Sequence, residues 1–437
     1  MRLRTSDLAV AALGELVGPD LEVDGATIDS RQVRPGQLFV PVVAERDGHD
    51  YVGAALAGGA AAYLASDREI VDAHGGTAIL VADTLQALQA AGRLARGHLR
   101  PPVVGITGSV GKTSVKDLLA AVLGQRLRTT ASEKSFNNEM GVPLTLLGAP
   151  DGTEAIVVEM GARDRGHIAA LCEIAQPTIG VVTRVAAVHT EVFGTIEDVA
   201  RAKSELVRDL PVDGTAILNA ADPRVAAMAA VTPASVVHFG TGGDVWADDL
   251  ALDHELQARF TLRSPWGTVP VALGARGVHQ VDNALAAAAA ALVCGLTLNE
   301  VAAGLERAVL SPWRMELATA PDGALVLNDA YNANPTSVAA ALESLVALPA
   351  ARRIAVLGVM AELGPTSDAD HAAIGELAAR LGVRLLAVDA PAYGGEQVAT
   401  IEEAMDLLEP LGPGDAVLVK GSRVAGLERL AELLLEE

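Results

Sequence analysis

Short runs of β-branched and other apolar residues alternate along this chain with longer stretches rich in alanine and leucine. A first series of apolar runs occupies residues 103–107, 155–159, 179–183 and 216–219, and a second occupies residues 325–328, 353–357, 385–389 and 416–420. Near-continuous apolar strands are buried on both faces, as in the parallel sheets of doubly wound α/β folds. The pattern therefore predicts two such sheets, with helices between the strands, for example over residues 337–347 and 369–381.

The segments around the two series divide the chain further. Residues 256–273 predict a β-hairpin that turns at the Ser-Pro-Trp-Gly of residues 264–267. Pro101 and Pro102 directly precede the first series and Pro312 precedes the second, and proline cannot continue a helix. We therefore expect an α/β protein of three domains, of which the central one has a mostly parallel sheet and the last is Rossmann-like. Their expected ranges are residues 1–100, 101–310 and 311–437.

Composition limits the classes of partner. The 437 residues are half apolar and have a formal charge of −22. This acidic excess argues against a nucleic-acid partner or a polybasic membrane anchor, because its field repels polyanions, whereas a small phosphate ligand needs only local donors. Two cysteines are too few for a disulfide framework or a cysteine zinc site. The first residues lack the apolar core of a signal peptide, and the longest apolar run, 284–296, is too short to span a bilayer, so we expect a cytoplasmic protein.

The sharpest local signal is a glycine-rich turn between the apolar run 103–107 and a helical pattern that begins near residue 115. A strand, such a turn and a helix direct successive backbone N–H groups and a helix N-terminus at an anion. The positive charge of Lys112 can lie beside the β- and γ-phosphates of a nucleotide, and the Thr113 hydroxyl can bind Mg²⁺. The expected phosphate-binding residues are Gly108, Ser109, Val110, Gly111, Lys112, Thr113 and Ser114.

A phosphate loop by itself leaves GTPase switches, motors, kinases and ligases open. Glu159 ends the run 155–159, and a carboxylate at the carboxyl end of a parallel strand is well placed to bind Mg²⁺. His189 follows the next strand, where a histidine is more often a structural hydrogen bonder. Lys203 lies in a helical stretch, where composition alone indicates a solvated surface lysine.

The order of motifs along the chain supplies a second argument. The turn at residues 108–113, the Asn-Asn-Glu-Met-Gly-Val-Pro of residues 137–143, Glu159, His189 and the Ala-Arg-Ala-Lys-Ser-Glu-Leu of residues 200–206 follow one another. Arg314-Met-Glu316, the Asp-Ala-Tyr-Asn-Ala-Asn-Pro of residues 329–335 and the Lys-Gly-Ser-Arg of residues 420–423 come later, and Asp29-Ser-Arg31 and Asp47-Gly-His-Asp50 come before. Together these motifs resemble the Mur ligase family over essentially the whole chain.

The resemblance implies an ATP- and Mg²⁺-dependent, ADP-forming amide ligase of peptidoglycan precursor synthesis. Within the family, the motif at residues 329–335 is similar to that of the ligases that add D-alanyl-D-alanine to UDP-N-acetylmuramoyl-tripeptide. In such an enzyme the γ-phosphate activates a substrate carboxylate as an acyl phosphate, which the amine then attacks. We expect this activity, in a cytoplasmic monomer.

The resemblance also implies roles for individual residues. Those with an expected catalytic role are Lys112, His189, Lys203 and Arg314. Those expected to bind the metal are Thr113, Glu159, His189 and a carbamylated Lys203. Beyond the phosphate loop, the expected nucleotide-binding residues are Asn283, Arg314, Asp329 and Asn332. The residues expected to bind the UDP-sugar substrate are Ser30, Arg31, Gly48 and His49, with Asn137 and Asn138 near the muramoyl part.

Six positions depart from the family pattern. They are Arg184 and Ala186 before the histidine, Ala221 where the first aspartate of an Asp-Asp-Pro turn is usual, Gln280 after His279, Trp313 where a glycine usually precedes Arg-Met-Glu, and Val359 where an aspartate is usual. Two alternatives therefore stay open at this point. The chain could be another amide ligase of the superfamily, such as a folylpolyglutamate-type enzyme or a specialised-metabolism paralogue, or a non-catalytic phosphate-loop protein that binds a partner.

Overall fold

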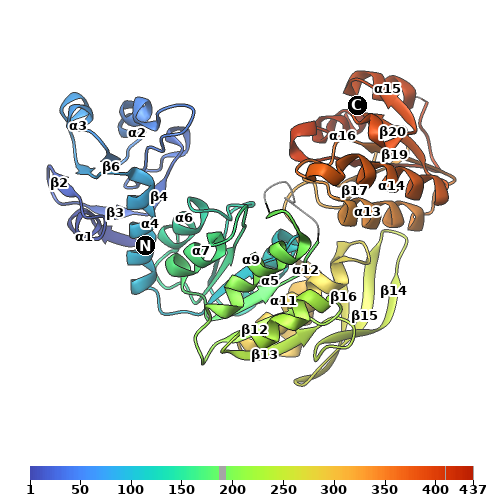
Figure 1. Cartoon of the computed structure of the whole chain (residues 1–437), viewed down its shortest axis with the longest axis horizontal. Helices are drawn as coiled ribbons and strands as arrows, with labels where there is room; N and C mark the ends of the chain where they lie inside the picture. The colour runs from blue at the N-terminus through green and yellow to red at the C-terminus, as the bar shows by residue number, and fades with distance from the viewer. Residues whose placement is uncertain (187–192, 409, 437) are drawn as a thin grey trace.

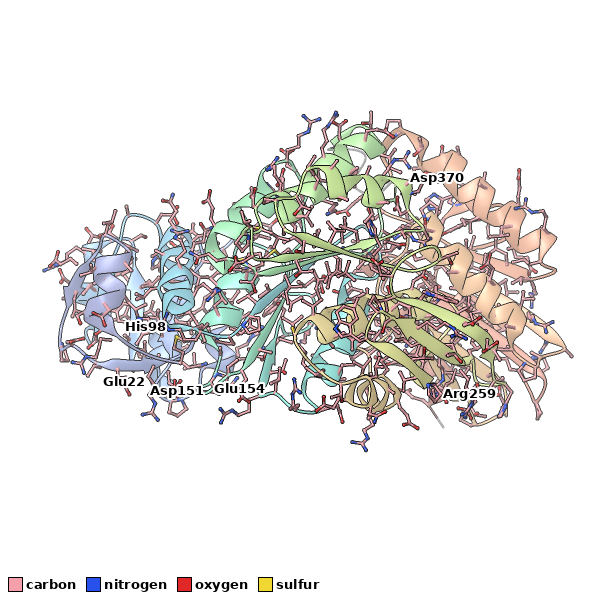
Figure 2. All side chains as sticks on the ribbon, turned by 90° about the horizontal axis from the view of Figure 1, so that it is seen from below. Glu22, His98, Asp151, Glu154, Arg259 and Asp370 are labelled. Atoms are coloured by element: carbon pink, nitrogen blue, oxygen red, sulfur yellow. The ribbon has the colours of Figure 1, made fainter. Side chains whose placement is uncertain are left out.

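The computed structural model describes residues 1–186, 193–408 and 410–436, and these residues form an α/β structure with five sheets. In Figure 1 the blue N-terminal sheet lies at one end of the molecule, the green central sheet in the middle and the orange C-terminal sheet at the other end. The turned view of Figure 2 agrees, because Glu22 and Asp370 are at opposite ends of the molecule. In the part of the chain so described, no helix is both long and apolar enough to cross a membrane.

The N-terminal part contains a five-stranded sheet in the order β2-β7-β6-β5-β4 beside the antiparallel pair β1-β3. Its elements are β1 (Arg2–Arg4), α1 (Thr5–Ala11), β2 (Glu15–Val17), β3 (Glu22–Asp24), β4 (Ala26–Thr27), β5 (Leu38–Phe39), α2 (Val52–Ala57), β6 (Ala62–Ala65), α3 (Arg68–His74) and β7 (Ala78–Leu80). Helix α4 (Thr84–His98) begins at an Asp83 cap and packs on the central sheet's helices, where the Cβ of an alanine at Gly92 would lie 2.5 Å from Pro143.

The central sheet has six parallel strands in the order β13-β12-β11-β8-β10-β9. They are β8 (Val103–Thr107), β9 (Thr129–Ala131), β10 (Ala155–Glu159), β11 (Ile179–Val182), β12 (Thr215–Asn219) and β13 (Ser235–Phe239). The helices around it are α5 (Lys112–Leu123), α6 (Gly141–Leu147), α7 (His167–Ala175), α9 (Ile196–Arg208), α10 (Pro223–Ala226), α11 (Gln280–Val293) and α12 (Leu298–Arg307). Successive strand residues serve opposite faces: Val103 packs in the core that includes α4, α6, α7 and α9, and Val104 packs in the core that includes α5, α11 and α12.

Two further sheets complete the fold. The hairpin β15 (Gln257–Ser264) and β16 (Gly267–Arg276) pairs Ser264 with Gly267, as predicted, and β14 (Trp246–Leu252) adds a third antiparallel strand. The C-terminal sheet has the order β17-β18-β22-β19-β20-β21, parallel except for the antiparallel edge strand β17. Its elements are β17 (Glu316–Thr319), β18 (Leu325–Asn328), α13 (Pro335–Ala347), β19 (Arg352–Leu357), α14 (Ser367–Arg380), β20 (Arg384–Val388), β21 (Glu396–Val398), α15 (Ile401–Leu408), β22 (Asp415–Lys420) and α16 (Glu428–Leu435).

The eight strands predicted from apolar runs are all present, each within one residue of its predicted ends. The two example helices, 337–347 and 369–381, correspond to α13 and α14. The apolar pattern did not reveal the edge strands β9, β13, β14, β17 and β21, nor the strands β1 to β7 of the N-terminal part. Strands β9, β14 and β21 are short or solvent-exposed along most of their length, so they need no continuous apolar run.

Candidate active site

A cavity of about 1240 Å³ opens between the central and the C-terminal sheets. The wall on one side, here called the central wall, includes the β8–α5 turn, the end of β10 and part of α9. The opposite, C-terminal wall includes the linker before β17 and the loop after β18. Both series of parallel strands thus direct their carboxyl ends toward ligand space, as open α/β sheets usually do.

The turn after β8 has the backbone of a phosphate loop. Gly108 has φ +148°, and a Cβ there would lie 1.9 Å from the Thr183 hydroxyl oxygen. Gly111 has φ +86°, and a Cβ there would lie 2.4 Å from the Asn283 amide oxygen. Glycine is therefore required at both positions for backbone conformation and for space. Helix α5 begins at the next residue, so its free N–H groups face the cavity.

The Lys112 side chain folds back onto this turn. Its Nζ donates to the Gly108 carbonyl at 2.7 Å and to the Ser109 carbonyl at 3.3 Å. Burial lowers the pKa of Lys112, the positive charge of Arg314 lowers it further, and Glu159 opposes both effects. A lysine held in this way sits beside any anion that the turn binds.

The central wall has a buried carboxylate beside the turn. Glu159 is 1% exposed, and it accepts a 2.7 Å hydrogen bond from the Thr113 hydroxyl and a 2.8 Å hydrogen bond from the Asn137 amide. The structure thus brings together two of the oxygen ligands expected for Mg²⁺. Among the residues described, no three His, Cys, Asp or Glu side chains form a group that could hold a metal. A cation here would need further ligands from a phosphate or water, which is the usual situation of Mg²⁺.

Lys203 is buried, so the interpretation as a solvated helix lysine is wrong. Its side chain is 2% exposed on α9 and lines the cavity. Burial, with the nearby charge of Lys112, lowers the pKa of Lys203 to about 7. Two residues further on, Glu205 accepts hydrogen bonds from the backbone N–H groups of Gly166 and Ala169 at 2.7 and 3.0 Å, which fixes α9 against α7. The expected partner His189 lies outside the described residues.

The C-terminal wall is organised by Asp329. Its Oδ1 accepts a 3.1 Å hydrogen bond from the Met315 backbone N–H, and its Oδ2 is 2.5 Å from the Lys420 ammonium. Lys420 is 2% exposed and also donates to the Asn332 carbonyl at 2.8 Å. Asn332 itself uses its amide oxygen to accept from the next backbone N–H. The loop after β18 is therefore fixed by a buried ion pair.

The linker before β17 brings Arg314 to this wall. The Arg314 guanidinium stacks on the Tyr331 ring at 4.1 Å from its centroid. Its Nε is buried, and no described residue accepts a hydrogen bond from it. Trp313 and Met315, on either side, have φ +61° and +54°, which is strained for residues other than glycine. Met315 is buried with Leu256 in one hydrophobic cluster, so the linker also packs against the hairpin sheet.

Comparison with known proteins agrees with this geometry. The family model of the Mur ligase middle domain matches residues 106–291, and that of the Mur ligase glutamate ligase domain matches residues 313–423. The chain belongs to the Mur ligase family. A UDP-N-acetylmuramoyl-tripeptide–D-alanyl-D-alanine ligase of Mycobacterium tuberculosis (strain H37Rv) is 40% identical, covering 99% of this chain and 98% of the relative. The ligase of that name from Escherichia coli K12 is 36% identical over 97% and 96% of the two chains.

Solved Mur ligase structures have the same fold. A crystal structure of MurF from Acinetobacter baumannii superposes with a TM-score of 0.90 at 30% identity, covering 100% of this chain and 99% of that one. MurF from Thermotoga maritima in complex with ADP gives a TM-score of 0.83 at 29% identity, covering 94% and 97%. The three-domain Mur ligase architecture expected from the sequence is thus confirmed.

The departures from the Mur ligase pattern have local explanations in the fold. Arg184 pairs with Asp282 at 3.1 Å, and burial raises the pKa of that aspartate. The Ala186 N–H donates to the Ser109 hydroxyl at 2.9 Å, a contact that any residue can make. The Gln280 amide oxygen accepts from Asn283 at 2.8 Å. Arg423 stacks on Trp313 at 4.4 Å from the ring centroid. Nothing in the structure explains Val359.

The residues expected at the UDP end lie apart from this cavity, on the N-terminal part. His49 is 4% exposed, with its Nδ1 2.6 Å from Asp47 and its Nε2 accepting from the Ser66 N–H at 3.2 Å. Gly48 leaves no room for a side chain, because a Cβ would lie 2.6 Å from the Val42 nitrogen. Ser30 begins a short 3₁₀ turn, and Arg31 pairs with Asp29 at 2.8 Å. Closer to the cavity, Asn138 accepts from the Gly141 N–H at the start of α6.

The sequence analysis did not single out the lysine that organises the C-terminal wall. A detectable signal exists, because Lys420 ends the apolar run 416–420, where a buried lysine needs a carboxylate partner. The chain has only five lysines. Lys112, Lys203 and Lys420 line the cavity, and Lys116 is 3% exposed beneath its central wall. Lysine is thus concentrated around the site.

Proposed function

We propose that this chain is an ATP-dependent, ADP-forming ligase that joins D-alanyl-D-alanine to UDP-N-acetylmuramoyl-tripeptide in peptidoglycan precursor synthesis. The observation that supports it best is that charged residues line both walls of one cavity. Lys112, Glu159 and Lys203 lie on the central wall, opposite Arg314 and Asp329 on the C-terminal wall. The near full-length similarity to relatives with this named activity favours it over a folylpolyglutamate-type or paralogous amide ligase. A non-catalytic binding protein would have no need of this arrangement of buried charges.

The site suits ATP and Mg²⁺. The glycine backbone and the start of α5 supply N–H donors for phosphate oxygens, and Lys112 supplies charge. The proposed metal ligands are Thr113, Glu159, His189 and the carbamate of Lys203, all oxygen or imidazole donors. When bound, Mg²⁺ would draw electron density from the γ-phosphate and reduce its repulsion of the substrate carboxylate. Asp329, Asn332 and Asn283 would hold the nucleoside.

The reaction joins two anions, so the protein must supply positive charge where they meet. We infer that Lys112 neutralises the phosphates from the central wall, while Arg314, whose buried Nε lacks a protein partner among the described residues, offers a hydrogen bond to the transferring phosphoryl group. In the first step an oxygen of the tripeptide carboxylate attacks the γ-phosphorus, the bond from that phosphorus to the β–γ bridging oxygen breaks, and ADP leaves as the acyl phosphate forms. In the second step the D-alanyl-D-alanine amine attacks the acyl carbon, phosphate leaves, and the amine loses a proton.

We assign binding of the UDP-substrate to a domain of residues 1–100 and binding of ATP to a domain of residues 101–310. A third, C-terminal ligase domain of residues 311–437 completes the ATP site. Ser30, Arg31, Gly48 and His49 would form or support the UDP end, and Asn137 and Asn138 would contact the muramoyl part. Because His49 is buried, its role would be to shape the loop through Asp47 and Ser66. We further propose that the enzyme works as a cytoplasmic monomer, since both walls of the cavity come from one chain.

The test is ligation with defined substrates. Purified protein with ATP and Mg²⁺ should release phosphate only when a UDP-N-acetylmuramoyl-tripeptide and D-alanyl-D-alanine are both present, and mass spectrometry should detect the pentapeptide product. A panel of tripeptides that differ in the third residue would define specificity. Phosphate release with a folate and glutamate would support the paralogue instead, and nucleotide binding without any acceptor-dependent turnover would support the binding protein.

A further inference from the structure

The two walls of the cavity touch through a pair of hydroxyl groups. Ser135 belongs to the loop after β9 on the central wall, and Tyr331 belongs to the loop after β18 on the C-terminal wall. The Ser135 and Tyr331 hydroxyls form a hydrogen bond. Neither residue binds nucleotide, metal or substrate in the function proposed above, so the pair is free to act on the geometry of the site.

On the C-terminal wall, Tyr331 supports Arg314. The Arg314 guanidinium stacks on the Tyr331 ring at 4.1 Å, and the Tyr331 backbone N–H donates to the Trp313 carbonyl at 3.2 Å. A cation over an aromatic face is held in both position and orientation. A displacement of Tyr331 would therefore displace the guanidinium that is proposed to meet the phosphoryl group.

On the central wall, Lys116 fixes the loop that contains Ser135. The buried Lys116 ammonium donates to the Ser132 and Lys134 carbonyls at 2.9 and 2.8 Å. It is also 2.9 Å from Asp117, whose carboxylate accepts from the Ser311 backbone N–H at 2.7 Å. Lys116 and Asp117 lie on α5, directly after the phosphate loop, so one helix contacts the nucleotide site, the Ser135 loop and the start of the linker.

We propose that Ser135 and Tyr331 form a latch that holds the two walls together in the closed enzyme, and that Lys116 is a positioning residue for its central half. Closing the latch places Arg314 opposite Lys112, and opening it lets substrates and products exchange. The proposal rests on the function proposed above, since the latch matters for catalysis only if both walls take part in phosphoryl transfer. We expect the latch to increase the rate of the chemical step and not the affinity for ATP.

A double-mutant cycle tests the latch. Ser135→Ala and Tyr331→Phe should each lower kcat about tenfold and leave KM for ATP within about twofold, because each removes a contact made only on closure. The double variant should lose about tenfold rather than about a hundredfold, since both changes remove one shared interaction. Tyr331→Leu, which also removes the stacking surface, should lose more than Tyr331→Phe. Additive losses in the double variant, or a wild-type kcat in either single variant, would overturn the latch.

Matched controls separate this effect from loss of stability. Tyr393→Phe also removes a phenol hydrogen bond, here a buried one to the Gly358 carbonyl at 3.0 Å, but away from the cavity. It should lower thermal stability and leave kcat unchanged. Lys116→Met should speed amide hydrogen exchange over residues 132–136 and lower kcat without adding to Ser135→Ala. Wild-type exchange and kcat in Lys116→Met would exclude the positioning role.

X-ray scattering distinguishes the latch from the proposed function. With a non-hydrolysable ATP analogue, Mg²⁺ and UDP-N-acetylmuramoyl-tripeptide, the wild-type radius of gyration should decrease, and Tyr331→Phe and Ser135→Ala should compact less. This measurement needs no turnover, so it judges the latch even if ligation fails. Compaction of both variants to the wild-type value contradicts the latch and leaves the ligase assignment intact.

Discussion

The two walls of the cavity are built differently. The central wall takes Glu159 from the end of β10 and Lys112 and Thr113 from the start of α5, which follows the adjacent parallel strand β8. The backbone hydrogen bonds of one sheet therefore set their relative positions. The C-terminal wall reaches the same space through a linker with two strained residues, Trp313 and Met315. Its side chains are held by an ion pair, a stacked ring and one hydroxyl contact.

This difference predicts different roles for the two walls, one in the chemical step and the other in closing the site. The central wall holds its charges whether or not the other wall is near, so its residues should affect the chemical step most strongly. The C-terminal wall must be brought into place each time, so Asp329 and Lys420 should affect nucleotide affinity, and Arg314 and Tyr331 should affect the rate through closure. Substitutions ranked by expected effect test this division.

The largest effect is expected on the central wall, at the phosphate loop. Lys112→Ala removes the only lysine of the turn and should lower kcat about a thousandfold, as loss of a preorganised charge at a phosphoryl group does. Steady-state phosphate release measures it. Lys134→Ala, which removes the one exposed lysine, is the control and should be wild type. Ligation by Lys112→Ala at the normal rate would mean that the turn does not hold ATP.

The next largest effect is expected at Lys203. Lys203→Ala should lower kcat about a hundredfold if its carbamate binds the metal, and short carboxylic acids should restore part of the rate. Because the pKa of Lys203 is lowered to about 7, the amine is mostly neutral above that pH and protonated below it. Only the neutral amine adds CO₂, so wild-type activity should fall as pH decreases through about 7 and should fall on bicarbonate depletion. An active Lys203→Ala variant that acids do not affect contradicts carbamylation.

A smaller effect is expected on the C-terminal wall, at the Lys420–Asp329 pair. Lys420→Met leaves Asp329 buried beside the cavity without its cation and should raise KM for ATP about tenfold, with only a small change in kcat. Thermal unfolding should show a loss of about 3 kcal/mol, typical of one partner removed from a buried pair. Asp329→Asn should resemble it, and the two changes together should not add. If Lys420→Met raised KM for the tripeptide and not KM for ATP, the nucleoside would not bind at Asp329.

The smallest effect is expected in the linker. Trp313→Gly removes a left-handed strain of about 1 kcal/mol and also the stacking partner of Arg423, so the free energy of unfolding should change by less than about 1 kcal/mol. The freer linker should lower kcat two- to fivefold. Trp313→Ala keeps the strain and loses the stacking, so it should be less stable than Trp313→Gly. Equal stabilities would show that the backbone strain is not significant.

The fold could be predicted wherever burial is continuous, because β8, β10 and β18 are mostly buried apolar strands. Site residues lie at their carboxyl ends: Gly108 follows β8, Glu159 ends β10 and Asp329 follows β18. The phosphate loop could be predicted because its spacing is local. The burial of Lys203 could not be predicted from the helical pattern, since a helix in isolation does not reveal which face meets another domain; only the resemblance to the Mur ligases indicated a place in the site. Tyr331 and Lys420 were missed for a related reason: their partners Ser135 and Asp329 are far away in sequence, and only folding brings them together.

The concentration of lysine around the cavity makes the chain unusually suited to selective chemistry. Among the residues described, Lys134 is the one lysine with an exposed side chain, and the rest of the positive surface charge is arginine, which does not react with amine reagents. A mild acylating reagent should therefore modify Lys134 first. Labelling of Lys112 and Lys203 would follow only as the cavity opens, and nucleotide should protect them. With so few amines, ¹³C bicarbonate could give a single resolved carbamate resonance, so the state of one buried residue could be observed directly in the working enzyme.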